Sequence, residues 1–169
     1  ARCPKDNVVG GVNNGWKVAM TTLGFERGSS ATTGYRRFLR EWDAVVKIAQ
    51  KNGKNKNSLT RDALVKAWSK VKIMEVNGYR SLTDALNGTH NAALLGACNK
   101  MFWSETHKRT MNLAIDILGM EGQVLTGSGD AESVLPGNRR GRDDYPVSDV
   151  QASFFFSRSE TIWGGTAEI

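Results

Sequence analysis

Residues 35–49 read YRRFLREWDAVVKIA, and the apolar members of this stretch recur at steps of three and four residues. This spacing places them on one face of an α-helix, so the stretch predicts an amphipathic helix with a buried stripe. The helical pattern begins near Gly15 and ends at Asn52-Gly53, a pair typical of a helix C-terminus. The stripe is interpreted as core, and its members are Tyr35, Phe38, Leu39, Trp42, Val45, Val46 and Ala49.

Two further long helices are expected. The second should run from about Ser58 to Asn87-Gly88, and the third, which Thr89 can cap, should end at Gly119 or Gly122. The predicted buried face of the second helix consists of Leu64, Ala67, Trp68, Val71, Met74, Gly78 and Leu82. The corresponding face of the third consists of Leu94, Cys98, Met101, Phe102, Leu113, Ile117 and Leu118.

The remainder predicts a loop and a shorter helix. Residues 120–147 contain Gly, Pro and charges without periodicity, which is typical of an irregular loop. Ser148 and Gln151 have the spacing of a capping box, so a fourth helix is expected over about 149–162, ended by Gly164-Gly165. Thr166 can cap a further helix that has no room before Ile169, so we expect a piece of a longer protein. The pattern predicts an all-α fold, an antiparallel four-helix bundle.

Composition narrows the class of protein. The chain has 169 residues, 40% of them hydrophobic and 24% charged, and no apolar run approaches the ~20 residues of a membrane span. Cys3 and Cys98 do not suggest a disulfide scaffold, which favours a reducing, cytoplasmic location. His90 and His107 have no partner at metal-ligand spacing, so no metal site is predicted.

The net charge of +6 is compatible with a polyanionic ligand. The basic residues are scattered and form no stripe with stacking aromatics, so nucleic acid is not an expected partner. Phosphate-rich small molecules such as FAD and coenzyme A fit this charge as well.

Two segments resemble the acyl-CoA dehydrogenase family. Residues 4–16 (PKDNVVGGVNNGW) are similar to the stretch that joins the family's middle β-domain to its C-terminal helical domain. Residues 157–169 (SRSETIWGGTAEI) are similar to the motif before the family's last helix. With the helices between them, the resemblance covers essentially the whole chain. It implies that residues 1–14 are the linker or end of the β-domain and that 15–169 are the C-terminal helical bundle, truncated in its last helix.

The resemblance also implies an activity and partners. Members of the family convert an acyl-CoA thioester into the 2,3-enoyl-CoA with FAD as cofactor, and a carboxylate removes the α-proton. It further implies an electron acceptor such as an electron-transfer flavoprotein, the N-terminal and β-domain portions of the same protein, and a homo- or hetero-oligomer, either a dimer or a tetramer.

The catalytic base is expected on the first helix. In many members a Glu immediately precedes the Gly-Thr of the second motif, where this sequence has Gly164. In the isovaleryl and long-chain branches the base lies on the first helix of the domain, directly before an Arg. This sequence has Glu26-Arg27 there, so we predict Glu26 as the base.

Other site residues follow from the same resemblance. Predicted substrate-binding residues are Leu23, Gly24, Phe25, Arg27, Trp163 and Gly165. Predicted cofactor-binding residues are Asp116, Ile117, Leu118, Gly119 and Met120, together with the capping turn Thr166, Ala167 and Glu168. Two positions depart from the family: Asp116 replaces the usual Gln, and Lys51 or Lys54 stands where an Arg is common.

Three alternatives remain beside the dehydrogenase. A non-catalytic subunit of a heteromeric acyl-CoA dehydrogenase is favoured by Gly164 and by the weakened flavin contacts, and is disfavoured by Glu26. An acyl-CoA oxidase would share most of these motifs. A purely structural helical bundle is the third. The type of acyl chain stays open.

Overall fold

The computed structural model describes residues 4–88, 92–124 and 148–164, without the side chains of residues 24–32, 92–95 and 97. The described part contains only helices, which confirms the predicted all-α class. Five are α-helices: α1 (Gly15–Thr33), α2 (Tyr35–Lys51), α3 (Ser58–Leu86), α4 (Ala92–Leu118) and α5 (Asp149–Ser159). Three are short 3-10 helices: η1 (Lys5–Asn7), η2 (Lys54–Lys56) and η3 (Gly119–Gln123).

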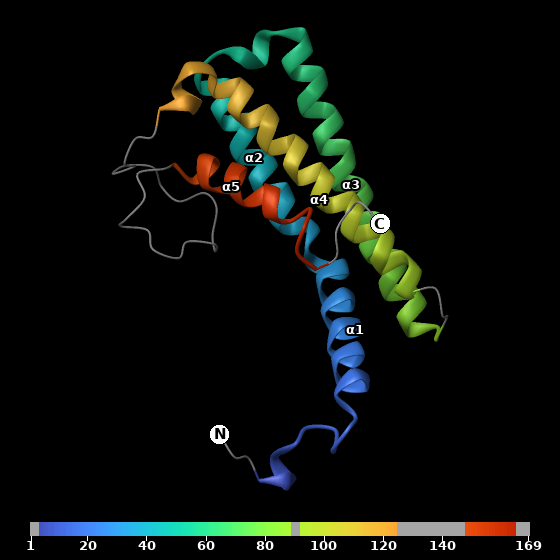
Figure 1. Cartoon of the computed structure of the whole chain (residues 1–169). Coiled ribbons are helices and arrows are strands. Elements are labelled where there is room, and N and C mark those ends of the chain that lie inside the picture. The colour runs from blue at the N-terminus through green and yellow to red at the C-terminus, as the bar shows by residue number, and fades with distance from the viewer. Residues whose placement is uncertain (1–3, 89–91, 125–147, 165–169) are drawn as a thin grey trace.

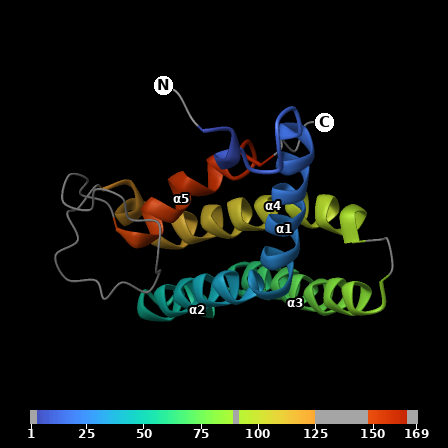
Figure 2. The same ribbon diagram turned by 90° about the horizontal axis from the view of Figure 1, so that it is seen from below.

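Helices α2 to α5 form the antiparallel bundle (Figure 1). Each of these helices runs opposite to the one before it, α2 and α5 both pack on α4, and α3 packs on α2 and α4. Helix α1 precedes α2 in the chain and extends away from the N-terminal end of α2. Figure 2 shows α1 crossing the other helices. It lies against α3 and α4 near the start of α2 and projects beyond them toward the N-terminus.

The helical pattern that was expected to begin near Gly15 and continue to residue 51 is divided in two. A turn at Gly34 separates α1 from α2. Thr32, Thr33 and Gly34 have low helix propensity, because β-branched side chains lose rotamer freedom and glycine loses backbone freedom in a helix. The division lets α1 point in a direction of its own.

The predicted bounds of α3 are confirmed, and its start has a clear cause. The Asn57 side chain accepts hydrogen bonds from the backbone N–H groups of Leu59 and Thr60, at 2.9 and 3.1 Å. An Asn at this position satisfies donors that the first helical turn leaves free. Gly53, with φ +75°, makes the turn that precedes it.

The predicted capping box of α5 is also present. The Ser148 hydroxyl accepts from the Gln151 N–H at 3.3 Å, and the Gln151 side chain accepts from the Ser148 N–H at 2.9 Å. The Gln151 amide also donates to the carbonyls of Gly122 and Val124, both at 2.9 Å. Because Gln151 bonds to both segments, the beginning of α5 is held against the end of η3.

The expected irregular loop begins with an ordered element. Residues 119–123 form η3, so the prediction of a loop from residue 120 is wrong at its start, because the chain tightens into one more turn after α4. Helix α5 ends at Ser159, earlier than expected, and a turn over residues 160–164 follows it. The predictions for Thr89, for the rest of the loop (125–147) and for Gly165 and Thr166 lie outside the described residues.

The interior has two parts. The apolar core consists of Val45, Ala49, Leu64, Met111, Ala114, Ile117 and Val150. The aromatic core consists of Phe38, Val71 and Met74, with Tyr35, Leu39, Phe102 and Trp103 packed against them. Four predicted core residues are exposed instead: Trp68, Leu82, Cys98 and Met101. The predicted stripes were therefore wider than the surface that the neighbouring helices cover.

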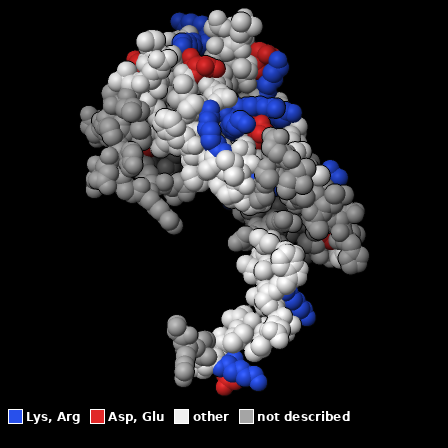
Figure 3. All heavy atoms as spheres, in the orientation of Figure 1, with Lys and Arg blue, Asp and Glu red and all other residues white. Residues whose placement is uncertain are grey.

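Basic side chains mark one face of the bundle. Figure 3 shows Lys and Arg side chains gathered over the region where α4 runs in Figure 1, with few acidic side chains among them. This distribution agrees with the net charge of +6.

Candidate functional site

Helix α1 presents an exposed apolar stripe. Trp16, Met20 and Leu23 are 79, 43 and 37% exposed, and their spacing of four and three residues places them on one side of the helix. Glu26 and Arg27 come three and four residues after Leu23, a spacing that continues the same side of the helix. The backbone of Gly24, Phe25, Glu26 and Arg27 is helical, and their side chains lie outside the description.

The turn after α5 carries the second predicted site. Trp163 is 47% exposed, and its indole N–H donates to the Ser159 hydroxyl at 3.2 Å. Gly164 has φ +70° and no neighbouring atom within 4 Å of where a Cβ would lie. A side chain there would have space but would be strained, because L-residues rarely adopt this backbone conformation. Four other predicted residues, Gly165, Thr166, Ala167 and Glu168, lie outside the described part of the chain.

The third predicted segment, Asp116 to Met120, closes α4. The Lys54 ammonium group donates to the Asp116 carbonyl at 2.9 Å, and the Asn52 amide donates to the Ile117 carbonyl at 2.7 Å. These donors satisfy carbonyl groups that a helix C-terminus leaves free. Ile117 belongs to the apolar core, Leu118 is half-buried and Met120 is exposed.

Lys54 therefore acts within the chain. Its ammonium group lies 3.2 Å from where a Cβ of Gly119 would be, so it reaches the turn between α4 and η3. Lys54 is one of the two lysines that stand where the family commonly has an Arg, and in this structure its ammonium group contacts a backbone carbonyl.

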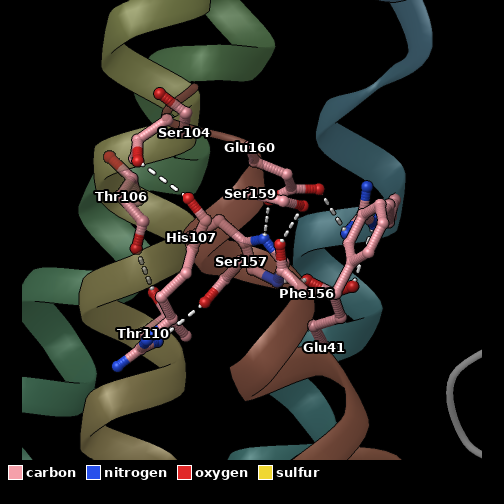
Figure 4. A network of polar contacts seen from close by, with 12 residues as sticks. Glu41, Ser104, Thr106, His107, Thr110, Phe156, Ser157, Ser159 and Glu160 are labelled. Atoms are coloured by element: carbon pink, nitrogen blue, oxygen red, sulfur yellow. Dashed lines mark hydrogen bonds and ion pairs between the residues drawn. The ribbon is translucent and has the colours of Figure 1, made fainter. Parts of the chain in front are cut away.

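Sequence reasoning missed a ring of four ionisable residues, which we call the charged ring: Arg37, Glu41, His107 and Glu160. Figure 4 shows Glu41, His107 and Glu160 close together. Arg37 and Glu41 come from α2, His107 from α4, and Glu160 from the turn after α5. Glu41, His107 and Glu160 are all buried, and Glu160 is 0% exposed.

Each carboxylate in the charged ring joins both cations. Arg37 Nε donates to Glu41 Oε1 at 3.0 Å, and Arg37 Nη2 lies 2.9 Å from Glu160 Oε1. His107 Nε2 lies 3.0 Å from Glu41 Oε2, and His107 Nδ1 contacts Glu160 Oε2. The charges alternate around a closed cycle, so each charge has an opposite charge on both sides.

This geometry controls the protonation of His107. Burial alone would lower the pKa of the His107 imidazole, but its contacts with Glu160 and Glu41 outweigh burial and raise that pKa. Burial likewise would raise the pKa of Glu41, while His107 and Arg37 outweigh it and lower that pKa. Each ring nitrogen lies close to a carboxylate oxygen, and this geometry stabilises the protonated imidazole relative to the neutral one.

A column of aromatic rings connects the charged ring to Trp163. The centroid of the His107 ring is 5.3 Å from that of Phe38, and Phe38 stacks on Trp103 at 5.8 Å. Trp103 contacts Trp163 at 5.9 Å. These separations are those of favourable aromatic pairs. Trp163 therefore rests on a buried support that begins at His107.

The signal for the charged ring was present in the sequence but weak. Glu41 follows Arg37 by four residues and lies at the edge of the apolar stripe of α2, where a carboxylate requires a partner. Glu160 lies inside the motif that carried the family resemblance. Spacing along the chain could not show that residues 41, 107 and 160 meet.

Two of the predicted segments approach one another at the start of α2. Glu160 contacts Arg37, which lies three residues after Gly34. Since α2 begins directly after Gly34, this contact places the turn after α5 beside the first turn of α2, which follows α1 in the chain. The Asp116–Met120 segment is at the opposite end of α4 from the start of that helix, beside the α2–α3 connection.

Within the described ranges, no group of three or more His, Cys, Asp or Glu side chains is arranged to hold a metal ion. None of the described helices has both the length and the hydropathy needed to cross a membrane.

The sequence matches a known family model. The model described as acyl-CoA dehydrogenase, C-terminal domain, matches residues 13–169. The chain therefore belongs to the acyl-CoA dehydrogenase family and corresponds to its C-terminal domain.

Two curated relatives agree with this assignment. Acyl-CoA dehydrogenase IpdE1 of Mycolicibacterium smegmatis is 31% identical over 169 residues, which cover 100% of this chain and 37% of the relative. The protein of the same name from Mycobacterium tuberculosis is 28% identical over 172 residues, which cover 100% of this chain and 39% of the relative. The chain thus spans well under half the length of these relatives.

A solved structure shares the fold. It is named "Tcur3481-Tcur3483 steroid ACAD G363A variant", and it superposes with a TM-score of 0.71 over 94% of this chain and 38% of its own. At 23% sequence identity, this similarity supports the fold alone. The predicted bundle of the acyl-CoA dehydrogenase C-terminal type is confirmed.

Proposed function

We propose that this chain is the C-terminal part of an FAD-dependent acyl-CoA dehydrogenase that forms the 2,3-enoyl-CoA, with Glu26 as the base that removes the α-proton. The observation that supports this most strongly is the pairing of two positions. Glu26 lies on α1 directly before Arg27, while Gly164, at the other position where the family places its base, has no side chain.

The surroundings of position 26 suit this role. An acyl chain requires an apolar wall, and the exposed stripe of Trp16, Met20 and Leu23 ends one helical turn before Glu26. A base must come within about 3 Å of the carbon that loses the proton, so a rigid helix is a suitable support. Leu23, Gly24, Phe25 and Arg27 are the proposed substrate neighbours on the same helix.

A flavin fits best beside Trp163, which was predicted to contact the substrate; of the two predicted cofactor segments, only Asp116–Met120 is described. The half-exposed indole of Trp163, supported by Trp103, offers a flat aromatic wall for a ring system. The Asp116–Met120 segment fits less well, because the carbonyls of Asp116 and Ile117 are already hydrogen bonded to Lys54 and Asn52. FAD, when bound, supplies the hydride acceptor, and the proposed part of this chain is proton removal and orientation of the thioester.

Several parts of the proposal rest on the family alone. They are the N-terminal and β-domain portions, the oligomer and the electron-transfer flavoprotein as acceptor. The proposed cytoplasmic location rests on the two cysteines. The acyl group is left open, because the steroid dehydrogenase is similar to this chain only at the level of fold.

A second candidate function is a non-catalytic subunit of a heteromeric acyl-CoA dehydrogenase. Gly164 favours it, since the position used as the base in many members has no carboxylate. The two candidates differ in whether Glu26 is needed for chemistry.

The test is Glu26→Gln in the complete protein that contains this chain. Stopped-flow reduction of the flavin by an acyl-CoA substrate should fall by ~10²–10⁴-fold, while thioester binding should remain, because Gln keeps the size of Glu. Glu105→Gln on α4 is the matched control, since its carboxylate makes only ion pairs with Lys108 and Arg109, at 3.4 and 4.0 Å. Flavin reduction that is unchanged in Glu26→Gln would support the non-catalytic subunit instead.

A further inference from the structure

The turn after α5 is connected to the interior along two independent routes. One is covalent, because Glu160 of the charged ring lies three residues before Trp163 in the same turn. The other is the aromatic column, which leads from His107 through Phe38 and Trp103 to the Trp163 indole. Both routes begin at the charged ring and end at Trp163, so they form a closed loop of contacts.

Glu160 is held unusually firmly for a residue at the end of a short helix. Both oxygens of its carboxylate are engaged, one by Arg37 at 2.9 Å and the other by His107. The guanidinium of Arg37 also lies over the rings of Phe38 and Phe156, at 5.2 and 5.9 Å from their centroids. The Glu160 side chain is therefore held between α2 and α4.

The rest of the turn has little other support. Gly164 has no neighbour within 4 Å of a possible Cβ, and Ile162 is exposed. Among the described residues, the contacts of Trp163 beyond the column lie within its own segment. Its backbone N–H donates to the Ser159 carbonyl at 3.0 Å, its indole N–H donates to the Ser159 hydroxyl at 3.2 Å, and its ring lies 6.4 Å from that of Phe156. The direction of the indole relative to the bundle thus depends on Glu160 and Trp103.

A purely stabilising role explains this arrangement poorly. Burying ionisable groups such as Glu41, His107 and Glu160 is often no more favourable than apolar packing of the same volume, because desolvation opposes the ion pairs. The charged ring instead favours one geometry, because its four groups are paired only when α2, α4 and the turn after α5 are arranged as in this structure.

We propose that Glu160, through its contacts with His107 and Arg37, is a positioning residue that fixes the Trp163 indole as one wall of the flavin and thioester site. This inference rests on the proposed function. The role of the charged ring is to hold the turn that carries Trp163 in a fixed position relative to α2 and α4.

The experiment compares Glu160→Gln with Met111→Ala in the complete holoprotein. Glu160→Gln keeps the size of the side chain and removes its charge. Met111 is buried in the apolar core and makes no part of the charged ring or the column, so Met111→Ala is a control for general loss of core packing. Both are studied at a temperature at which circular dichroism shows them to be folded.

The first readout is the exposure of Trp163. It is the difference in acrylamide quenching of tryptophan fluorescence between each protein and its Trp163→Phe counterpart. We expect Glu160→Gln to increase quenching of Trp163 and Met111→Ala to leave it unchanged. The second readout is flavin reduction, which Glu160→Gln should slow by roughly tenfold in wild type and much less in the Trp163→Phe background.

Equal effects of Glu160→Gln and Met111→Ala on quenching would overturn the inference, as would an equal rate loss with and without Trp163. If Glu160→Gln does not fold, Arg37→Lys replaces it, because Lys keeps the charge but loses the two-point contact. If Glu26→Gln leaves flavin reduction unchanged while Glu160→Gln still raises Trp163 quenching, the proposed function fails and the positioning of Trp163 stands.

Discussion

Helix α1 and the turn after α5 are the two segments expected to face the reacting carbon, and they are built in opposite ways. Helix α1 carries a carboxylate at position 26 and leaves its apolar stripe exposed. The turn after α5 has Gly164 instead of a carboxylate, and its first residue, Glu160, is completely buried in the charged ring. The first segment carries the proposed base, and the second carries the half-exposed Trp163 indole packed on Trp103.

This difference is consistent with separate roles for the two segments, with the base on α1 and an aromatic wall on the turn after α5. When the base is on α1, the turn after α5 needs no reactive side chain. Its position can then be set by the buried contacts of Glu160 with Arg37 and His107. When the base is in the turn itself, the same position must carry a flexible carboxylate.

The largest expected effect concerns the exchange of the base between the two segments. Glu26→Gln should lower the rate of flavin reduction by ~10²–10⁴-fold, equivalent to about 3–5 kcal/mol of barrier. Adding Gly164→Glu should return part of that rate, since the turn has space for a side chain. The return should be incomplete because φ at position 164 is +70°, which strains any residue but glycine. Stopped-flow spectroscopy measures both steps, and a full return of rate would show that the turn is not strained.

The next effect is on the attachment of α5. His107→Leu leaves Glu41 and Glu160 buried without the cation that separates them, and breaking such a site typically costs about 3–5 kcal/mol. We expect amide hydrogen exchange in α5 and in the turn to accelerate accordingly, while α1 changes little. Acceleration that is equal in α1 and α5 would mean that the two segments are not independently supported.

The pH dependence of the α5 attachment should be bounded on both sides. The pKa of His107 is raised above its ordinary value of 6.5, so its contribution is complete below 6.5 and is lost as pH rises through the raised pKa. The pKa of Glu41 is lowered below 4.5, so its contribution is present above 4.5 and is lost as pH falls through the lowered pKa. Arg37 stays cationic throughout, because its pKa is raised by Glu41 and Glu160 despite burial.

The measurement is the difference in α5 hydrogen exchange between wild type and His107→Leu, corrected for the intrinsic effect of pH on exchange. Lys100 also interacts electrostatically with Glu160, so Lys100→Met serves as a control for its titration. A difference that grows toward alkaline pH would contradict the assigned direction of the His107 shift.

The smallest effect is expected on the stability of α1. Leu23 is 37% exposed on the described chain, so Leu23→Ala should change the local opening free energy of α1 by about 0.5 kcal/mol or less. If the stripe lines the acyl pocket, the same variant should raise the KM for long acyl-CoA substrates more than for short ones. A large loss of stability with no change in KM would show that the stripe is a packing surface instead.

The sequence predicted the helices well because their signals are local. The stripe of α2, the Asn-Gly end of that helix and the Ser148–Gln151 capping box each lie within a few residues, and each is found in the structure. The break at Gly34 was missed, because the apolar pattern continues across it and only low propensity marks the place.

The site was less accessible to sequence reasoning. Asp116 was assigned to the cofactor from its motif position, whereas the capping of its carbonyl by Lys54 depends on a loop 62 residues away. The charged ring joins α2, α4 and the turn after α5, and His107 is separated from Glu160 by 53 residues. Such contacts depend on the way helices pack, which residue spacing does not encode.

The central claim is that Glu26 removes the α-proton, and exchange of that proton with solvent tests it most directly. An acyl-CoA analogue that has an α-proton but no β-hydrogen separates proton removal from hydride transfer. With the complete holoprotein in deuterated water, mass spectrometry should show deuterium entering the analogue, and Glu26→Gln should slow its entry by at least ~10²-fold. Deuterium entry at the same rate in Glu26→Gln and in wild type would contradict the assignment of Glu26 as the base.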